Sequence, residues 1–273
     1  MRLLSNKVVK VCGGLLLALV FVAFIGPLLS PHEYQQTNFD KILQPPSFSG
    51  FHLFGTDDLG RDLFVRTMLG VQITVLVALV ASAVSLVIGV LYGAIAGLAG
   101  GRVDAITMRF VDTLYALPFI FFVILLMVVF ERNFLLIFVA IGAVNWLDMA
   151  RIVRGQTISL REREFVKAAE LTGVSFSKII ARHIAPNLIG VVIVYVTLTI
   201  PQAILVESFL SFLGLGIQEP QTSLGTLVDA GVNQMEGASW MLLIPATMLA
   251  AILLCFNFLG DALRDVFDAR QSR

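Results

Sequence analysis

The chain has 273 residues, of which 58% are hydrophobic and 14% are charged, and its mean hydropathy is +0.89. A soluble domain of this size does not bury so much apolar surface, so the composition excludes an ordinary soluble protein and indicates a polytopic helical membrane protein. Nineteen Lys and Arg residues balance nineteen Asp and Glu residues, so the net charge gives no indication of a nucleic-acid partner.

The first predicted element is an apolar run at about residues 11–29, which follows Arg2, Lys7 and Lys10. This run is longer than the hydrophobic region of a typical signal peptide, and no cleavage site of small residues follows it. We therefore expect a retained membrane-spanning helix. Together with the polar outer loop that follows, this helix makes up a predicted first region, residues 1–72.

The outer loop contains an acidic run at residues 54–66. Asp57, Asp58 and Asp62 are residue types that bind cations, but the further oxygen ligands of a calcium loop are missing at the required spacing. We therefore predict no metal site, and we expect Thr56 or Asp57 to cap a short helix on the membrane surface.

The rest of the chain, residues 73–273, is predicted to form the membrane core. Its hydrophobic runs are long enough to cross a bilayer. The predicted spans are residues 73–98, 113–130, 134–150, 190–212 and 240–260. In the first of these, small residues recur every four positions, which lets another helix of this chain or of a partner subunit pack closely. These small residues are Ala81, Ser85, Gly89, Gly93 and Gly97.

Three polar side chains inside the predicted spans are expensive to bury and therefore suggest function. Asp148 lies one helical turn before Arg151, so we expect an ion pair between them near the interface. Asn145 and Glu207 are the candidates for a solute pathway or gate.

Six spans place both termini on one side of the membrane. The segments on that side hold fifteen of the nineteen Lys and Arg residues, and the opposite segments hold four. The positive-inside rule therefore predicts that both termini are cytoplasmic. The polar loop at about residues 151–189, which is rich in cations, is then cytoplasmic as well.

This cytoplasmic loop is predicted to form two short helices around one turn. The first helix ends at Leu171, and Gly173 occupies the position of a glycine that stops a helix in the left-handed conformation. Ser175 can cap the second helix, and Pro186 is expected to end it because proline lacks a backbone N–H. The spacing leaves two interpretations open: an ordinary loop, or a docking element for a soluble partner.

The sequence carries no motif of an enzyme. GxxxxGK[ST], HExxH and GxSxG stretches are absent, so we expect no catalytic residues, no ATP hydrolysis and no cofactor on this chain. His32 and His52 lie in the outer loop and His183 in the cytoplasmic loop, and we expect that they do not share a site. An ion-driven secondary transporter remains an alternative, with Glu207 as its main ionisable group.

The cytoplasmic loop resembles the EAA loop of ABC importer permeases. Ala168, Ala169 and Gly173 stand in the register of that motif, and Lys167 stands where the first Glu of the general consensus is usual. The ending RHIAPN, residues 182–187, is similar to the peptide and nickel branch of the superfamily.

The outer run at residues 55–66 is similar to the GTDxLGRDxxSR signature of C-type permeases of peptide importers, with Val65 where a Ser is usual. Residues 207–220 and 256–265 fit the same type of subunit, although Leu224 stands where a Trp is frequent. The chain thus resembles ABC importer permeases of the peptide and nickel branch, most of all the oligopeptide permease C subunit.

This resemblance implies an all-α protein with six transmembrane helices and the type I ABC importer permease fold, in the bacterial inner membrane. The chain would form half of an oligopeptide pathway; the alternatives are a dipeptide or a nickel-chelate permease. The implied partners are a second homologous permease, two ATPase subunits that carry ATP and Mg²⁺, an extracytoplasmic peptide-binding protein, the peptide and membrane lipid. No nucleic acid is implied.

The resemblance also implies functional residues. The residues of an ATPase-coupling loop would be Glu164, Ala168, Ala169, Gly173, Arg182, His183, Pro186 and Asn187. The residues of the outer-loop signature would be Gly55, Thr56, Asp57, Gly60, Arg61 and Asp62. The resemblance does not imply which residues touch the solute.

Overall fold

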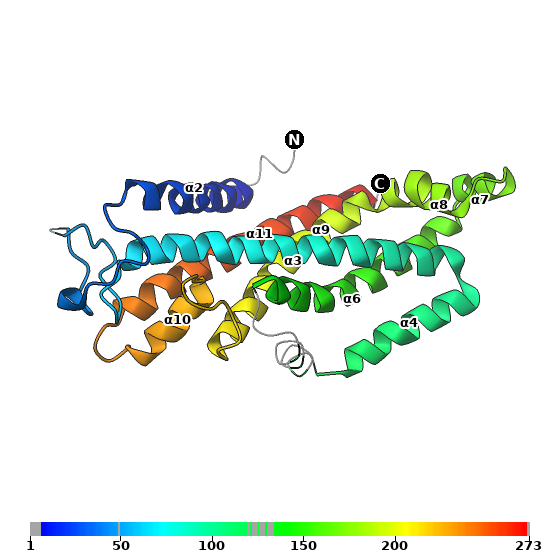
Figure 1. The fold of residues 1–273 in the computed structure, drawn as a ribbon. Coiled ribbons are helices and arrows are strands. Elements are labelled where there is room, and N and C mark those ends of the chain that lie inside the picture. The colour runs from blue at the N-terminus through cyan, green and yellow to red at the C-terminus, as the bar shows by residue number, and fades with distance from the viewer. Residues whose placement is uncertain are drawn as a thin grey trace. The chain divides into compact units, whose positions relative to one another are not determined.

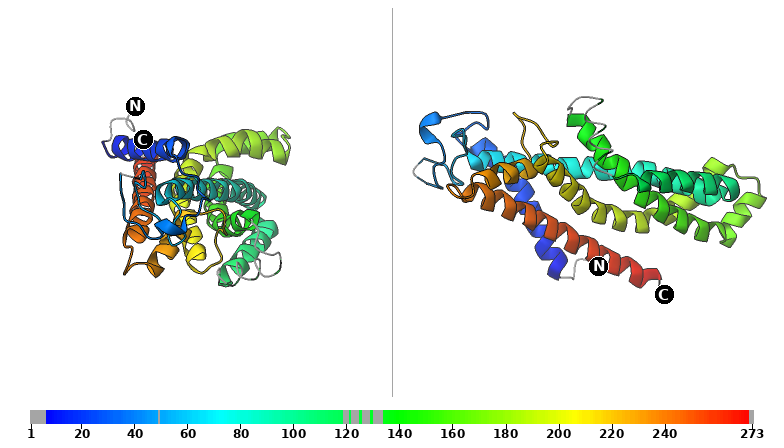
Figure 2. Two further views of the ribbon diagram at one scale, coloured as in Figure 1. Left: turned by 60° about the vertical axis from the view of Figure 1, so that its left-hand side comes forward. Right: turned by 90° about the horizontal axis from the view of Figure 1, so that it is seen from below.

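The structure is a computed structural model that describes residues 7–48, 50–118, 121, 125, 129 and 134–271. The chain divides into two compact units, which are described separately: unit 1 is Met1–Leu79 with Pro201–Ala262, and unit 2 is Val80–Ile200 with Leu263–Arg273. Within the described residues, most of the backbone is helical and the β-type pairings are two isolated bridges (Figure 1 and Figure 2). The elements in chain order are α2 (Lys7–Leu29), η1 (Phe39–Lys41), α3 (Leu63–Ala99), α4 (Gly101–Ala116), α6 (Phe134–Arg161), α7 (Glu164–Leu171), α8 (Phe176–Ile179), η2 (Ile180–Ile184), α9 (Ala185–Phe212), α10 (Leu224–Asn233) and α11 (Trp240–Gln271).

Four helical stretches of the described chain are long and apolar enough to cross a membrane. They are Lys7–Leu29, Leu63–Ala99, Phe176–Phe212 and Trp240–Val266. They include four of the predicted spans. Of the other two, residues 113–130 are described only at 113–118, 121, 125 and 129, and residues 134–150 form the first part of α6. The fold is therefore that of a polytopic helical membrane protein, and the number of six spans stays a prediction.

Helix α3 begins at Leu63, earlier than predicted. Asp62 fixes this start, because its Oδ1 accepts a hydrogen bond from the backbone N–H of Val65 at 2.9 Å, as an N-cap residue does. The prediction that Thr56 or Asp57 caps a short surface helix is wrong, since both side chains accept hydrogen bonds inside the loop that precedes α3.

The small-residue face of α3 packs against α6 inside unit 2. A Cβ atom added at Gly89 would lie 2.5 Å from the Cβ of Met149, and one added at Gly93 would lie 2.4 Å from the carbonyl oxygen of Ala150. Neither position has room for a side chain. The predicted close packing is confirmed, and the helix that approaches this face belongs to the same chain.

A hydrophobic cluster in unit 2 holds the short helices α7 and α8 against the longer ones. Val166 and Ala169 of α7 and Ile179 of α8 are buried in it. Burial of apolar area stabilises such a contact by about 25 cal/mol per Å². The cluster's buried residues are Ala94, Leu98, Met149, Val153, Val166, Ala169, Ile179, Ile184, Leu188 and Val192.

Pro186 does not end a helix, contrary to the prediction. The stretch Phe176–Phe212 is continuous, and η2, a π-helical turn, connects α8 with α9. The backbone N–H of Ala185 donates to the carbonyl oxygen of Ile180, five residues earlier. Proline has no N–H and crowds the carbonyl group four residues before it, and the wider π turn accommodates both defects.

Candidate functional site

The signature loop, residues 54–66, closes on two glycines in unit 1. Gly55 and Gly60 have positive φ angles of +80° and +71°. A Cβ atom at Gly60 would lie 1.8 Å from the carbonyl oxygen of Asn38. Both the backbone angle and the available space therefore require glycine at this position.

Asp57 organises the signature loop from inside. Its buried carboxylate accepts hydrogen bonds at Oδ1 from the backbone N–H of Leu59 at 3.0 Å and from that of Arg61 at 2.8 Å. Its Oδ2 accepts a hydrogen bond from Arg61 Nε at 2.6 Å. One carboxylate thus fixes the turn and orients the guanidinium group.

Thr56 connects the signature loop to the preceding segment. Its hydroxyl oxygen accepts a hydrogen bond from the backbone N–H of Gln44 at 2.8 Å and donates one to the carbonyl oxygen of Lys41 at 2.5 Å. Trp240 Nε1 donates to the carbonyl oxygen of Thr56 at 3.4 Å. The loop is therefore bonded to two other parts of unit 1.

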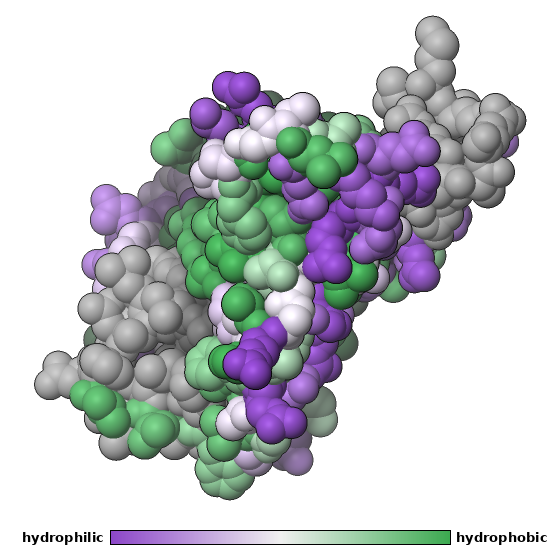
Figure 3. Space-filling model, turned by 90° about the vertical axis from the view of Figure 1, so that its right-hand side faces the viewer, coloured by the Kyte–Doolittle hydropathy of each residue, from purple (hydrophilic) through white to green (hydrophobic). Residues whose placement is uncertain are grey.

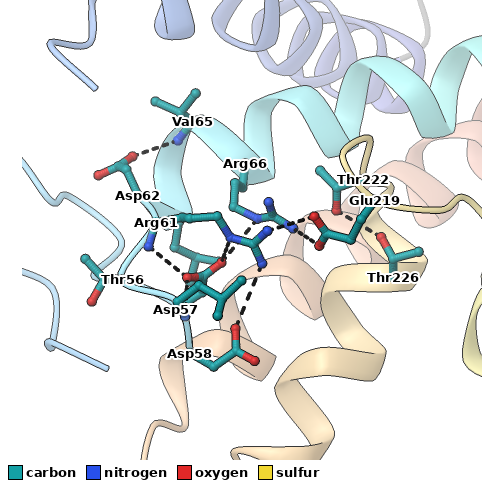
Figure 4. Close-up of polar contacts among 12 residues, drawn as sticks. Thr56, Asp57, Asp58, Arg61, Asp62, Val65, Arg66, Glu219, Thr222 and Thr226 are labelled. Carbon is teal, nitrogen blue, oxygen red and sulfur yellow. Dashed lines mark hydrogen bonds and ion pairs between the residues drawn. The ribbon is translucent and has the colours of Figure 1, made fainter. Parts of the chain in front are cut away.

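Two buried arginines converge on Glu219, as Figure 4 shows. Arg61 Nη1 donates to Glu219 Oε2 at 2.8 Å, and Arg66 Nη2 donates to Glu219 Oε1 at 3.1 Å. Arg66 Nε also lies 3.4 Å from Asp57 Oδ2. Arg66 and Glu219 are not among the site residues predicted from the sequence, because no local spacing connects residues this far apart in the chain.

The two guanidinium groups keep Glu219 ionised. Burial alone raises the pKa of this carboxyl group, but the positive charges of Arg66 and Arg61 outweigh burial and hold the pKa below its usual value. Because the pKa is lower in the folded state, these ion pairs stabilise the fold at pH values above the ordinary carboxyl pKa. Their contribution is lost as the pH falls through the lowered value.

His32 and His52, the two histidines of the outer loop, lie together. Their rings stack with centroids 4.2 Å apart. Lys41 Nζ can only donate, so its 3.3 Å contact with His52 Nε2 places the imidazole proton on Nδ1, which donates to Asp62 Oδ2 at 2.9 Å. His32, His52 and Asp62 are possible metal ligands, and their ligand atoms lie within 4.8 Å of one another. The lone pairs of the two stacked rings, however, lie in nearly parallel planes, and the ammonium group of Lys41 already contacts His52 Nε2. The group therefore acts as a brace of the outer loop.

Glu207 is fully buried in α9, beneath the start of α10. Its Oε1 accepts a hydrogen bond from Ser211 Oγ at 2.7 Å, while its Oε2 has no hydrogen-bond partner among the described residues. Ser211 Oγ lies 3.5 Å from the hydroxyl of Ser223, the N-cap of α10. Through Ser211, the carboxyl group thus faces the start of α10, and it is fully buried within the chain.

The polar residues of α6 find their partners on α4. The Tyr115 hydroxyl donates to Asp148, and Arg151 Nη2 donates to Asp112 Oδ1 at 2.7 Å. The predicted pair of Asp148 with Arg151 is therefore wrong, because a neighbouring helix offers each a better-placed partner. Asn145 is half-buried, and its Nδ2 has no partner in the described part of the chain.

In unit 2, α7 ends at Leu171 and turns at Gly173, as predicted. Gly173 has a φ of +77°. Its N–H donates to the carbonyl oxygen of Glu170, and the N–H of Val174 donates to that of Ala169, both at 3.0 Å. This pair of bonds is the Schellman motif, which needs a left-handed residue at the glycine position.

Residues 151–189, which we call the coupling loop after the motif that it resembles, present a mixed apolar and polar surface. Leu171 is 89% exposed and Phe165 and Phe176 are 42% and 44% exposed, and Figure 3 shows hydrophobic and hydrophilic surface side by side on the face it draws. Ala168 is exposed as well, whereas Ala169 is buried in the chain's own core. Of the two alanines, only Ala168 is available to a partner.

The charged side chains of α7 lie at its surface. Glu164 is in the first turn, where a carboxylate interacts favourably with the helix dipole. Lys167 Nζ lies 2.9 Å from Glu162 Oε2, and its hydrogen bond lowers the pKa of Glu162. The residue that departs from the general consensus thus has a partner in this chain.

The end of the coupling loop is built around η2. The His183 ring lies 6.3 Å from the Phe165 ring, measured between centroids. Asn187 Nδ2 donates to the carbonyl oxygen of His183 at 2.7 Å. Arg182 is exposed, so the loop places a cation beside the apolar surface of α7.

Four long apolar helices and two structured polar loops define an integral membrane protein. Residues 89–273 match the model of the family described as "Binding-protein-dependent transport system inner membrane component", and the chain belongs to that family. Residues 1–46 match the model described as "N-terminal TM domain of oligopeptide transport permease C".

Two curated relatives and one solved structure extend this finding. The chain is 47% identical to the oligopeptide transport system permease protein OppC of Haemophilus influenzae, over 98% of this chain and 86% of the relative. It is 43% identical to the dipeptide transport system permease protein DppC of Bacillus subtilis, over 100% of this chain and 85% of the relative. An inward-facing structure of the MetNI methionine ABC transporter matches with a TM-score of 0.58 and 17% identity, covering 72% of this chain and 94% of that chain. That match shows a shared fold, and the relatives are permease subunits and not enzymes.

Proposed function

We propose that this chain is a permease subunit of an ATP-driven importer and forms half of the transmembrane pathway for oligopeptides. The observation that carries this proposal is the similarity to a permease named for oligopeptide transport, which is 47% identical over 98% of this chain. The separate match of residues 1–46 to the permease C model supports the same subunit type. ATP and Mg²⁺ bind to two separate ATPase subunits, and this chain carries neither.

The coupling loop is the contact with an ATPase subunit. A docking element needs an exposed surface that is firmly attached to the body of the permease. Leu171 and Ala168 provide exposed surface, and Val166 and Ala169 provide the attachment by burial in the core of unit 2. The turn at Gly173 keeps the exposed surface compact.

The complete subunit has six spans, with both termini in the cytoplasm of a bacterial cell and the signature loop outside its inner membrane. The distribution of Lys and Arg supports this orientation. A second homologous permease completes the pathway, and an extracytoplasmic binding protein delivers the peptide. Asn145 and Glu207 are gate residues, and Glu207 acts through Ser211, whose hydroxyl lies 3.5 Å from that of Ser223 at the start of α10.

Purification of a tagged chain from its native membrane tests the proposal. We expect it to co-purify with a second permease and two nucleotide-binding subunits, and the reconstituted complex to import tripeptides and longer peptides with ATP. A preparation of this chain alone that transports solute in liposomes with an ion gradient would contradict the proposal and favour an ion-driven secondary transporter.

The second candidate solute is a dipeptide, which the 43% identity to a dipeptide permease favours. A nickel chelate is the third candidate. Competition for uptake distinguishes the three, since tripeptides, dipeptides or chelated nickel would compete most strongly in the respective cases. Unchanged peptide uptake together with loss of nickel uptake after deletion of the gene would reverse the order.

A further inference from the structure

A polar hollow of about 240 Å³ opens beside the ion network of unit 1. Most of its lining comes from the signature loop, the segment between α9 and α10, and α10 itself, and Ser211 of α9 and Met241 of α11 complete it. Most of this lining lies outside the four candidate spans, so the hollow belongs to the outer loops and not to a route through the membrane. We call it the acidic hollow.

The charges of the acidic hollow do not balance. Four carboxylates, those of Asp57, Asp58, Glu219 and Asp229, face the guanidinium groups of Arg61 and Arg66. The formal excess is two negative charges. A group that enters the hollow with a positive charge therefore gains electrostatic free energy.

The charges are also arranged in layers. Both arginine residues are buried, with exposed fractions of 8% and 4%. The carboxylates of Asp58 and Glu219 stand at the rim, where their side chains are 47% and 62% exposed, and Asp229 is half-buried. An approaching molecule thus meets negative charge first.

The buried layer offers one unused donor. Arg66 lines the hollow, and its Nη1 atom has no hydrogen-bond partner among the described residues, whereas its Nε lies 3.4 Å from Asp57 Oδ2. A buried donor without an acceptor is unfavourable, so this N–H group favours a ligand that brings an oxygen acceptor. Carboxylates at the rim and the free donor below them suit a basic side chain together with a carbonyl oxygen of its own backbone.

We propose that the acidic hollow receives a Lys- or Arg-bearing loop of the extracytoplasmic binding protein. This inference rests on the proposed function, because it assumes that such a protein delivers the solute. A protein loop is favoured over the transported peptide because the hollow is made of outer loops, is fixed by ion pairs and has a charge preference that an importer of many different peptides would not need.

Charge reversal at the rim tests the proposal. Asp229→Lys changes a side chain outside the ion network, so the network and the fold should be retained. Asp58→Lys also removes the ion pair of Asp58 Oδ1 with Arg61 Nη2 at 3.9 Å, while the shorter Arg61–Asp57–Glu219 hydrogen bonds remain. Glu33→Lys is the matched control, because Glu33 is an exposed acid of the same outer region and does not line the hollow. The assay measures the affinity of the source organism's own peptide-binding protein for the assembled importer in nanodiscs.

We expect Asp58→Lys and Asp229→Lys each to weaken this affinity at least tenfold at 0.1 M salt, with Glu33→Lys unchanged. The difference should shrink at 1 M salt, where the screening length falls from about 10 Å to about 3 Å. A Lys→Glu or Arg→Glu change in the binding protein that restores the affinity of Asp58→Lys would identify the inserted residue.

Equal affinities of the two rim variants and the control would overturn the proposal. So would an unchanged affinity for the binding protein together with weaker uptake of trilysine, which would assign the hollow to the transported peptide. The affinity of the binding protein for the importer is measured without transport and tests only the acidic hollow. The uptake of peptides and nickel chelates is a separate measurement and tests only the assignment of the solute.

Discussion

The signature loop and the coupling loop both turn at a glycine with a positive φ, yet the two glycines are needed for different reasons. At Gly60 a Cβ atom would lie 1.8 Å from the carbonyl oxygen of Asn38, whereas at Gly173 no atom lies within 4 Å. Gly60 is enclosed by its own chain. Gly173 is required by its backbone angle alone.

This difference shows how the two loops are stabilised. Buried ion pairs and hydrogen bonds fix the backbone of the signature loop from inside, so its shape is set within this chain. The coupling loop is held from beneath by Val166 and Ala169 and leaves its other side open. A surface that binds another molecule must be open to that molecule. We therefore expect substitutions in the signature loop to lower stability and substitutions on the open side of the coupling loop to lower transport.

The largest effect is expected for Gly60→Ala. The added methyl group collides with the backbone and also strains the positive φ, so we expect a loss of about 3 kcal/mol or more in folding free energy. Thermal unfolding in detergent can be followed through the reactivity of the buried free thiols of Cys12 and Cys255. Gly173→Ala is the control, with an expected loss of about 1 kcal/mol; equal losses for the two variants would refute the comparison.

The next effect is that of Glu219→Gln, which removes the carboxylate shared by Arg61 and Arg66. Breaking a buried ion pair costs about 3–5 kcal/mol, and the exposure of Glu219 reduces our expectation to about 2 kcal/mol at pH 7. Because the folded state lowers the pKa of Glu219, the difference from the unsubstituted protein should decrease as the pH falls below the ordinary carboxyl pKa. A stability difference that stays constant from pH 7 down to pH 3 would show that the charge is irrelevant.

A smaller effect on stability and a clear effect on transport are expected for Gly173→Asp. The side chain meets open space, so folding should lose about 1 kcal/mol, but a carboxylate enters the proposed contact with the ATPase. Peptide uptake should fall at least tenfold at normal membrane expression. Ala168→Glu should act in the same way without a strained φ, and normal uptake by both variants would disprove the coupling role.

The smallest effect is expected for Lys167→Glu. It removes an exposed ion pair with Glu162 and restores the residue that is usual at this position of the EAA motif. Exposed pairs of this kind contribute little. Uptake should stay within about twofold of the unsubstituted protein; a tenfold loss would mean that this lysine contacts a partner directly.

The helical membrane fold and the turn at Gly173 could be predicted from the sequence, because hydropathy and a C-terminal glycine act over short distances. The close packing of α3 was predictable for the same reason, since small residues recur along one helix face. The spacing did not indicate which helix packs there. The structure places α6 against Gly89 and Gly93.

Contacts between distant residues could not be predicted. Glu219 meets Arg61 from 158 residues away, and His32 meets His52 only after the outer loop closes. Asp148 was assigned a partner one turn away, but a neighbouring helix supplied Tyr115. Local spacing predicts which residues can meet along one helix. It does not predict the partners that tertiary packing brings from other parts of the chain.

The π turn also determines which way α9 faces. Ile179, just before the turn, and Ile184, its last residue, are both buried although five positions separate them, whereas Leu188 and Val192 continue the buried face at intervals of four. The wider turn absorbs one extra residue, so the apolar side keeps its direction across Pro186. The segment 180–184 therefore holds one residue more than an α-helical turn and keeps the helix that follows in the same rotational register.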